Sequence, residues 1–175
     1  MLSSIKWPVG YNKIVLDEVD STMAEANRRK TEILKPTWIL AKHQTSGYGR
    51  RGRVWSSPWG NFSATLVMGV VDSPVSLAKR SFVAALALFD SLVQVTNRPN
   101  LFSLKWPNDV LMNKKKVAGI LLESGGSSKN SDLLKIGIGV NLVALPNLSQ
   151  IENKREMLPI SLKDLSFNVS AEDFL

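Results

Sequence analysis

The stretch LFSLKWPNDVLMNKKKVAGILLE, residues 101–123, decides the fold. Its apolar residues fall into three short segments that we interpret as β-strands, Leu101–Lys105, Val110–Met112 and Lys116–Glu123. The connections between these segments, residues 106–109 and 113–115, are too short to contain a helix, so neighbouring strands must turn back on each other. The sequence therefore predicts antiparallel pairing here and argues against a doubly wound parallel sheet.

The regions on both sides of this stretch add further strands and a few helices. Alternating or continuous apolar residues predict strands at Asn12–Val19, Thr37–Ala41, Phe62–Val71 and Leu133–Asn141. Apolar residues at helical spacing and polar capping residues predict helices at Asp20–Lys30 and Leu77–Val95, with a further helix start at Ser170–Asp173. The predicted fold class is α+β, with a mixed, largely antiparallel central sheet and flanking helices.

The composition is that of one globular domain, residues 1–175, with 44% apolar and 21% charged residues. No apolar run is long enough for a signal peptide or a membrane span, so we expect a cytoplasmic protein that does not bind membranes. The absence of cysteine and the single histidine, His43, exclude disulfides, thiolate chemistry and a multi-histidine metal site. The net charge of +7 favours an anionic partner without identifying it.

The segment Gln44–Trp55, QTSGYGRRGRVW, is the strongest candidate site. Its three glycines allow a backbone that approaches a ligand closely, and successive N–H groups of such a loop can bind an anion. Its three arginines suit phosphate or carboxylate, and Trp55 can stack on a base. A loop that binds a nucleotide or another phosphate-bearing ligand is therefore indicated, with a disordered basic loop or an RNA-binding loop as alternatives.

Four shorter segments are weaker signals when each is taken alone. Lys105–Asp109 is more often a structural turn than a site, although Asp109 could help to hold a divalent cation. In Lys116–Glu123, Gly119 suggests close approach to the backbone, whereas Lys116 by itself could be one more exposed lysine. Gly137–Asn141 places two glycines on one strand face, and Asp20–Thr22 is at least a helix cap.

In this order, the five segments resemble the biotin protein ligase family. The resemblance runs from about residue 13 to residue 141, and the combination GYGRRGRVW, KWPND and KVAGIL is highly specific. It implies a fold like that of class II aminoacyl-tRNA synthetases and biotin ligases. It also implies an ATP-dependent enzyme, biotin–[acetyl-CoA-carboxylase] ligase, that forms biotinyl-5′-AMP and then transfers biotin to a lysine of a carrier protein.

The resemblance also implies roles for individual residues. Arg50 and Lys116 are expected to be catalytic because they would contact the reacting carboxylate and α-phosphate. Nucleotide binding is expected of Arg53, Trp55 and Asn141. The expected residues of the biotin and biotinyl-AMP site are Ser21, Thr22, Met23, Gln44, Gly47, Tyr48, Gly49, Arg50, Lys116, Gly119 and Gly139. Tyr48 stands where the family often has arginine, and Met23 stands where asparagine is common.

The implied substrates are biotin and ATP, with Mg²⁺ entering as part of the ATP complex and no tightly bound metal. The implied partner is the biotin carboxyl carrier protein of acetyl-CoA carboxylase or of a related biotin-dependent carboxylase, and a homodimer is possible. Because no winged-helix domain is expected before the catalytic domain, we expect no DNA binding. We also expect the catalytic domain to be incomplete at its C-terminal end, without the small β-barrel domain of the family. A lipoate ligase and a nucleic-acid-binding module are the alternatives.

Overall fold

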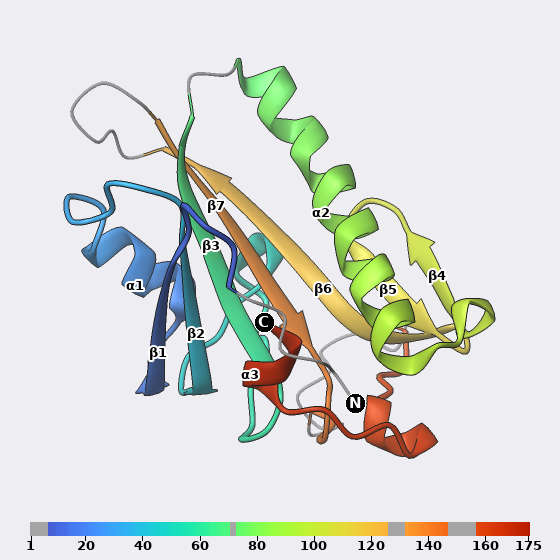
Figure 1. Cartoon of the computed structure of the whole chain (residues 1–175). Helices are drawn as coiled ribbons and strands as arrows, with labels where there is room; N and C mark the ends of the chain where they lie inside the picture. Colours follow the sequence, from blue (N-terminus) through green and yellow to red (C-terminus); the bar gives the residue numbers. More distant parts are fainter. Residues whose placement is uncertain (1–6, 71–72, 126–131, 147–156) are drawn as a thin grey trace.

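The computed structural model describes residues 7–70, 73–125, 132–146 and 157–175. Within these ranges, seven strands form one sheet in the order β1-β2-β3-β7-β6-β5-β4, so that β1 and β4 are its edges (Figure 1). The strands are β1 (Asn12–Val19), β2 (Thr37–Gln44), β3 (Phe62–Val70), β4 (Phe102–Lys105), β5 (Asp109–Met112), β6 (Lys115–Ser124) and β7 (Asp132–Val140). The α-helices are α1 (Thr22–Arg28), α2 (Pro74–Thr96) and α3 (Ala171–Phe174).

The sheet is mixed and largely antiparallel, which confirms the predicted fold class. β1 lies parallel to β2, and the other five neighbouring pairs are antiparallel. A parallel pair needs a crossover connection, and α1 lies in the chain between β1 and β2. The turn between β4 and β5 contains a cis peptide bond at Trp106–Pro107, and the turn between β5 and β6 passes through Asn113 and Lys114, both at positive φ.

The predicted elements are all present, and most of them differ from the prediction only at their ends. The predicted strand Thr37–Ala41 continues to Gln44, because the ladder extends through polar residues that an apolar pattern does not reveal. The predicted helix at Leu77–Val95 begins at Pro74, where the Ser73 side chain caps the helix by accepting a hydrogen bond from the Ser76 N–H. The predicted strand end at Val71 lies outside the described residues.

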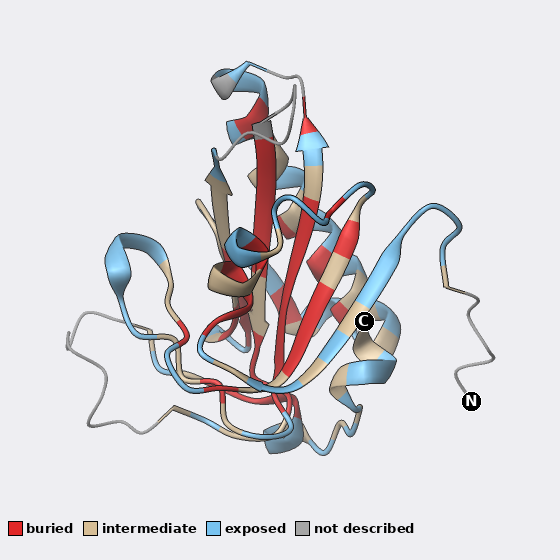
Figure 2. Ribbon diagram, turned by 90° about the vertical axis from the view of Figure 1, so that its left-hand side faces the viewer, coloured by how far each residue is buried: buried red, intermediate tan, exposed pale blue. Residues whose placement is uncertain are grey.

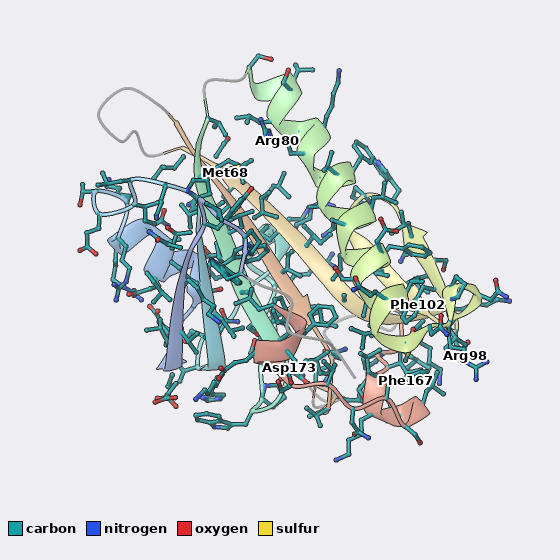
Figure 3. All side chains as sticks on the ribbon, viewed as in Figure 1. Met68, Arg80, Arg98, Phe102, Phe167 and Asp173 are labelled. Carbon is teal, nitrogen blue, oxygen red and sulfur yellow. The ribbon has the colours of Figure 1, made fainter. Side chains whose placement is uncertain are left out.

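One face of the sheet is covered by α2 and α3 over the main hydrophobic core (Figure 1). Leu92 of α2 and Leu134 and Val140 of β7 are almost completely buried there. Phe174 of α3 packs edge-on against Phe62 of β3, with ring centroids 5.1 Å apart. Figure 3 shows how α2 lies along the sheet, from Arg80 near Met68 of β3 to Phe102 at the other end.

The opposite face carries a smaller core under α1. Ala26 of α1 packs there with Ile39, Val67 and Leu133 of three neighbouring strands. The central strands are buried over most of their length, whereas the edge strand β1 alternates between exposed and half-buried residues (Figure 2). Among the helices of the described ranges, none combines the length and apolar character that a membrane crossing requires.

Candidate active site

The site lies on the α1 face, on a row of four residues that runs across the sheet. Ser63 of β3 pairs with Gly139 of β7, Gly139 pairs with Gly119 of β6, and Gly119 pairs with Asp109 of β5. The row therefore has a hydroxyl at one end, bare backbone in the middle and a carboxylate at the other end. All four residues line a cavity of about 530 Å³, which is in the size range of small-molecule sites.

Trp55 lies directly on the two glycines in the middle of this row. A Cβ atom added to Gly139 would collide with the indole ring, and one added to Gly119 would lie 3.2 Å from it. The sequence suggested that these glycines allow a ligand to approach the floor. In this structure the group that makes the close approach is the Trp55 side chain. The absence of a Cβ at Gly139 therefore makes room for the indole ring.

The charged end of the cavity is built by Lys116 and Asp109. The Lys116 Nζ lies 2.9 Å from Asp109 Oδ1 and 5.5 Å from the centroid of the Trp55 ring. Asp109 Oδ1 is buried, and the Lys116 ammonium group is the cation beside it. The main chain of Lys116 is fixed by hydrogen bonds to Leu158 and Ile160, each 2.9 Å long.

Arg50 reaches the same end from the arginine loop, which we define as residues 45–56. Its Nη1 donates a 3.2 Å hydrogen bond to Asn108 Oδ1, and the Asn108 amide donates to the Ile120 carbonyl oxygen over 2.8 Å. Within the loop, the Gly49 N–H donates to the Arg53 carbonyl oxygen and the Trp55 N–H donates to that of Gly47. The loop is thus folded back on itself and brings Arg50 to the cavity that Lys116 of β6 also lines.

The neutral end of the cavity is lined by polar side chains from α1 and β2. Ser21 caps α1 by accepting a hydrogen bond from the Met23 N–H, which confirms the predicted capping role of this segment. Both the N–H and the hydroxyl of Thr22 donate to Gln44 Oε1, over 2.8 and 3.1 Å. All four of these residues are buried, so their polar groups are matched to one another or turned toward the cavity.

Tyr48, the departure from the family pattern, also lines the cavity. Burial raises the pKa of its hydroxyl, and the negative charge of Glu123 acts in the same direction. Glu123 is paired with Lys135, whose Nζ lies 3.0 Å from Glu123 Oε2 and donates to Asn27 Oδ1 of α1 over 2.7 Å. The loop side chain at this position is therefore a neutral hydrogen-bonding group beside an already paired carboxylate.

The cavity gathers the sequence-predicted site residues almost completely. Gly47 is the exception, since it lies behind the wall, where an added Cβ would be 2.6 Å from the Trp55 carbonyl oxygen and 2.8 Å from the Gln44 amide nitrogen. The predicted residues that line the cavity are Ser21, Thr22, Met23, Gln44, Tyr48, Gly49, Arg50, Arg53, Trp55, Lys116, Gly119, Gly139 and Asn141. Asn141 is buried, and its amide donates to the Ile160 carbonyl oxygen over 3.3 Å.

The sequence reasoning did not find the polar residues that β3 contributes. Ser63 lines the cavity, and the Thr65 hydroxyl donates to the Thr22 hydroxyl over 2.8 Å. The signal was present in the alternation of Phe62, Ala64 and Leu66 with these two polar residues, which assigns opposite faces to the two sets. It went unused because the whole segment was interpreted as a buried strand.

This arrangement can bind a small ligand that is neutral at one end and anionic at the other. The hydroxyl and amide end can hydrogen-bond a neutral polar group, and the glycine floor with Trp55 suits an apolar middle. Arg50 and Lys116 supply fixed positive charge where an anion would lie. In the described parts of the chain, no group of three or more acidic or histidine side chains could hold a metal ion.

The chain belongs to the biotin/lipoate A/B protein ligase family, whose model matches residues 15–141. It is 43% identical to the biotin–[acetyl-CoA-carboxylase] ligase of Paracoccus denitrificans over 92% of this chain and 67% of that protein. This similarity confirms the family that the five sequence segments indicated.

Solved structures support the same assignment. The biotin protein ligase of Leishmania major in complex with biotinyl-5-AMP matches with a TM-score of 0.77 at 29% identity, over 96% of this chain and 71% of that chain. The biotin protein ligase of Aquifex aeolicus in complex with biotin and ATP matches with a TM-score of 0.73 at 30% identity, over 93% and 65%. The chain thus spans about two thirds of the length of these relatives.

Proposed function

We propose that this chain forms biotinyl-5′-AMP from biotin and ATP and then transfers the biotin to a lysine side chain of a carrier protein. The observation that carries the proposal is the row of residues across the sheet that lines the cavity. It runs from the polar wall at Ser63, over the two glycines under Trp55, to the end where Arg50 and Lys116 lie near Asp109. Biotin has the same sequence of groups: a neutral ureido ring, an apolar bicycle and chain, and a carboxylate. The relatives are similar along this whole region.

In the first step, a carboxylate oxygen of biotin attacks the α-phosphorus of ATP. A new P–O bond forms, the bond to the bridging oxygen breaks, and diphosphate leaves. Two anions must come together, so fixed positive charge is required where the pentavalent phosphorus develops. We assign this role to Arg50 and Lys116, which line the same cavity, one beside Asn108 and the other beside Asp109. Mg²⁺ enters with ATP as part of the substrate.

In the second step, the amine of the acceptor lysine attacks the acyl carbon of the mixed anhydride. The C–N bond forms, the bond between the acyl carbon and the phosphate oxygen breaks, and AMP leaves as the amine loses a proton. No enzyme nucleophile is needed, which agrees with a chain that contains no cysteine. The acceptor is proposed to be the carboxyl carrier protein of acetyl-CoA carboxylase or of a related carboxylase, following the name of the Paracoccus relative.

The test is isothermal titration of this chain with biotin and separately with lipoate, followed by an assay of biotin-dependent exchange of diphosphate into ATP. Selective binding of biotin together with exchange supports the proposal. Selective binding of lipoate would show that lipoate, and not biotin, is the substrate. Binding of neither acid, together with salt-dependent binding of RNA or DNA, overturns the proposal in favour of a nucleic-acid-binding module.

A further inference from the structure

The outer side of α2 is apolar, although it faces away from the sheet. α2 lies over one face of the sheet, and its inner side belongs to the main hydrophobic core (Figure 1). On its outer side, Phe82, Val83 and Leu86 are 53%, 67% and 53% exposed, and Ala87 beside them is exposed as well. Single apolar residues are common on protein surfaces, but these residues lie within two turns of one helix and form a patch. Such a patch indicates an interaction surface.

Opposite charges mark the two ends of this patch. Lys79 lies one turn before it and Asp90 one turn after it, both side chains are exposed, and neither has an ion-pair partner among the described residues. Spacings of four, three and four residues separate Lys79, Val83, Leu86 and Asp90 along α2. These spacings place the four side chains on one line of the helix surface, about 16 Å long. The line therefore changes from a positive charge through apolar side chains to a negative charge.

A line of this composition is complementary to itself when it runs in the opposite direction. If a second copy of the chain packs its α2 antiparallel to the first, Lys79 lies opposite Asp90 of the second copy and Val83 lies opposite Leu86. A two-fold axis repeats both contacts, so two ion pairs flank an apolar centre. Alternating spacings of four and three residues are those of helices that pack side by side along one seam. Parallel helices, in contrast, would place each charge against the same charge.

We propose that the outer face of α2 pairs with the same face of a second copy of this chain, in an antiparallel arrangement around a two-fold axis. The dimer has the layers sheet, helix, helix and sheet. Both cavities remain open, because they lie on the other face of each sheet, and the edge strands β1 and β4 take no part. Three helical turns bury less than the roughly 1,200 Å² of a standard interface, so the dissociation constant should be on the order of 100 µM.

Sedimentation velocity of the whole chain at increasing concentration measures this association. At about 0.15 M salt, repulsion between copies that each carry a net charge of +7 is screened beyond about 8 Å, so the contact itself decides the outcome. The wild type should change from monomer to dimer around the expected dissociation constant. Leu86→Lys brings two unpaired charges into the apolar centre and should weaken association more than about tenfold. Thermal melting followed by circular dichroism checks that each variant is folded.

Charge reversal tests the direction of the helices. Lys79→Asp and Asp90→Lys each place like charges opposite one another at both ends of the interface, so each variant alone should associate at least about tenfold more weakly than the wild type. An equimolar mixture of these two variants restores both ion pairs and should associate about as tightly as the wild type. Lys30→Asp is the matched control, because Lys30 is exposed just after α1, on the opposite face of the sheet, and its reversal should leave self-association unchanged.

A second mixture separates local pairing from general attraction between oppositely charged variants. Asp90→Lys mixed with Lys30→Asp has the same difference in net charge, but one of its two end contacts still joins two lysines, so it should associate more weakly than the complementary mixture. Equal association in the two mixtures overturns the antiparallel pairing. A wild type that remains monomeric up to about 1 mM, tenfold above the expected constant, overturns the interface altogether. Self-association that Leu86→Lys leaves unchanged does the same, because it must then use another surface.

Discussion

The two faces of β3 and β7 are built from the same strands and have opposite character. Toward α2, Phe62 and Val140 enter the main hydrophobic core. Toward α1 and the arginine loop, the same strands present Ser63, Thr65 and the glycines at 137 and 139. One residue along either strand changes the surroundings from a packed core to a cavity, because strand side chains alternate between faces.

The two faces of the sheet therefore contribute to different properties of the protein, stability on one side and ligand binding on the other. The α2 face gains its stability from apolar area and close packing, so the volume of each side chain matters most. On the cavity face, missing side chains and paired polar groups leave room for a ligand and determine which groups it can meet. Substitutions on the α2 face should therefore change the free energy of unfolding, and those on the cavity face should change binding and catalysis.

The largest expected effect concerns the core. Leu92 on α2 is fully buried, and Leu92→Ala should lower the free energy of unfolding by about 3 kcal/mol through lost apolar burial and the cavity that remains. The measurement is urea denaturation followed by circular dichroism. Biotin affinity of the folded fraction should stay within about twofold, since a 1.4 kcal/mol change would be needed for a factor of ten. A tenfold loss of affinity would show that the two faces are coupled.

The converse experiment removes charge from the cavity face. Arg50→Ala and Lys116→Met should each reduce the rate of biotin-dependent diphosphate exchange by a factor on the order of 100, because each removes one charge partner of the transition state. The unfolding curve of Arg50→Ala should match that of the wild type, whereas Lys116→Met should be less stable because it leaves the buried Asp109 carboxylate without its cation. Lys79→Ala, on the exposed side of α2, is the control for loss of a positive charge and should retain full activity. Normal exchange in either cavity variant would exclude that residue from the mechanism.

A smaller effect is expected from substitutions of the two glycines that form the floor of the cavity. Gly139→Ala places a methyl group where the Trp55 indole now lies, so the ring must move and biotin should bind about tenfold more weakly, a loss of one well-packed contact. Gly119→Ala meets the same ring at 3.2 Å and should have a milder effect. Calorimetric titration of both variants with biotin would show which substitution weakens binding more. Equal affinities in the two variants and the wild type would mean that Trp55 is not part of the binding wall.

The smallest effect is a dependence of stability on pH at the start of α1. Hydrogen bonds from the Arg28 guanidinium, followed by the Ser21 N–H, lower the pKa of Asp20 from 3.8 to about 2. A depressed folded-state pKa contributes stability above the unfolded value, and that stability is lost as the pH falls from about 4 to 2. The carboxylate is half exposed, so the contribution should be well below 1 kcal/mol and should shrink with added salt.

Asp20→Asn tests this contribution directly. The variant should melt slightly below the wild type at pH 7, and the difference should shrink steadily toward pH 2, where about half of the wild-type carboxyl is protonated. Melting temperatures measured by circular dichroism across this range provide the comparison. A difference that persists at pH 2 would assign the effect to packing rather than to charge.

Much of the fold was predictable because short connections constrain topology. The turns at residues 106–109 and 113–115 leave no room for a helix, and the structure has antiparallel hairpins at both places. The strand at Asn12–Val19 was predicted with its observed limits. What periodicity could not reveal was the parallel pairing of β1 with β2, since a single edge strand can lie in either direction and still present the same alternating pattern.

The candidate site was predictable to a different degree. Arg50, Lys116 and the glycines came from motifs whose order along the chain is specific, and the structure brings them to one cavity. Ser63 and Thr65 belong to no such motif, because a hydroxyl in a strand has many ordinary structural uses. The contact between Trp55 and Gly139 joins residues 84 positions apart, and only the register of β7 against its neighbours reveals it.

That contact gives the protein a spectroscopic property. An indole is a fluorophore whose emission depends on the charge and water around it, and Trp55 lies beside the Lys116 ammonium group on the floor of the cavity. Of the four other tryptophans, Trp7, Trp38, Trp59 and Trp106, only Trp106 also lines the cavity. The centre of the candidate site therefore carries its own optical probe, able to follow the arrival of a ligand in real time without a label.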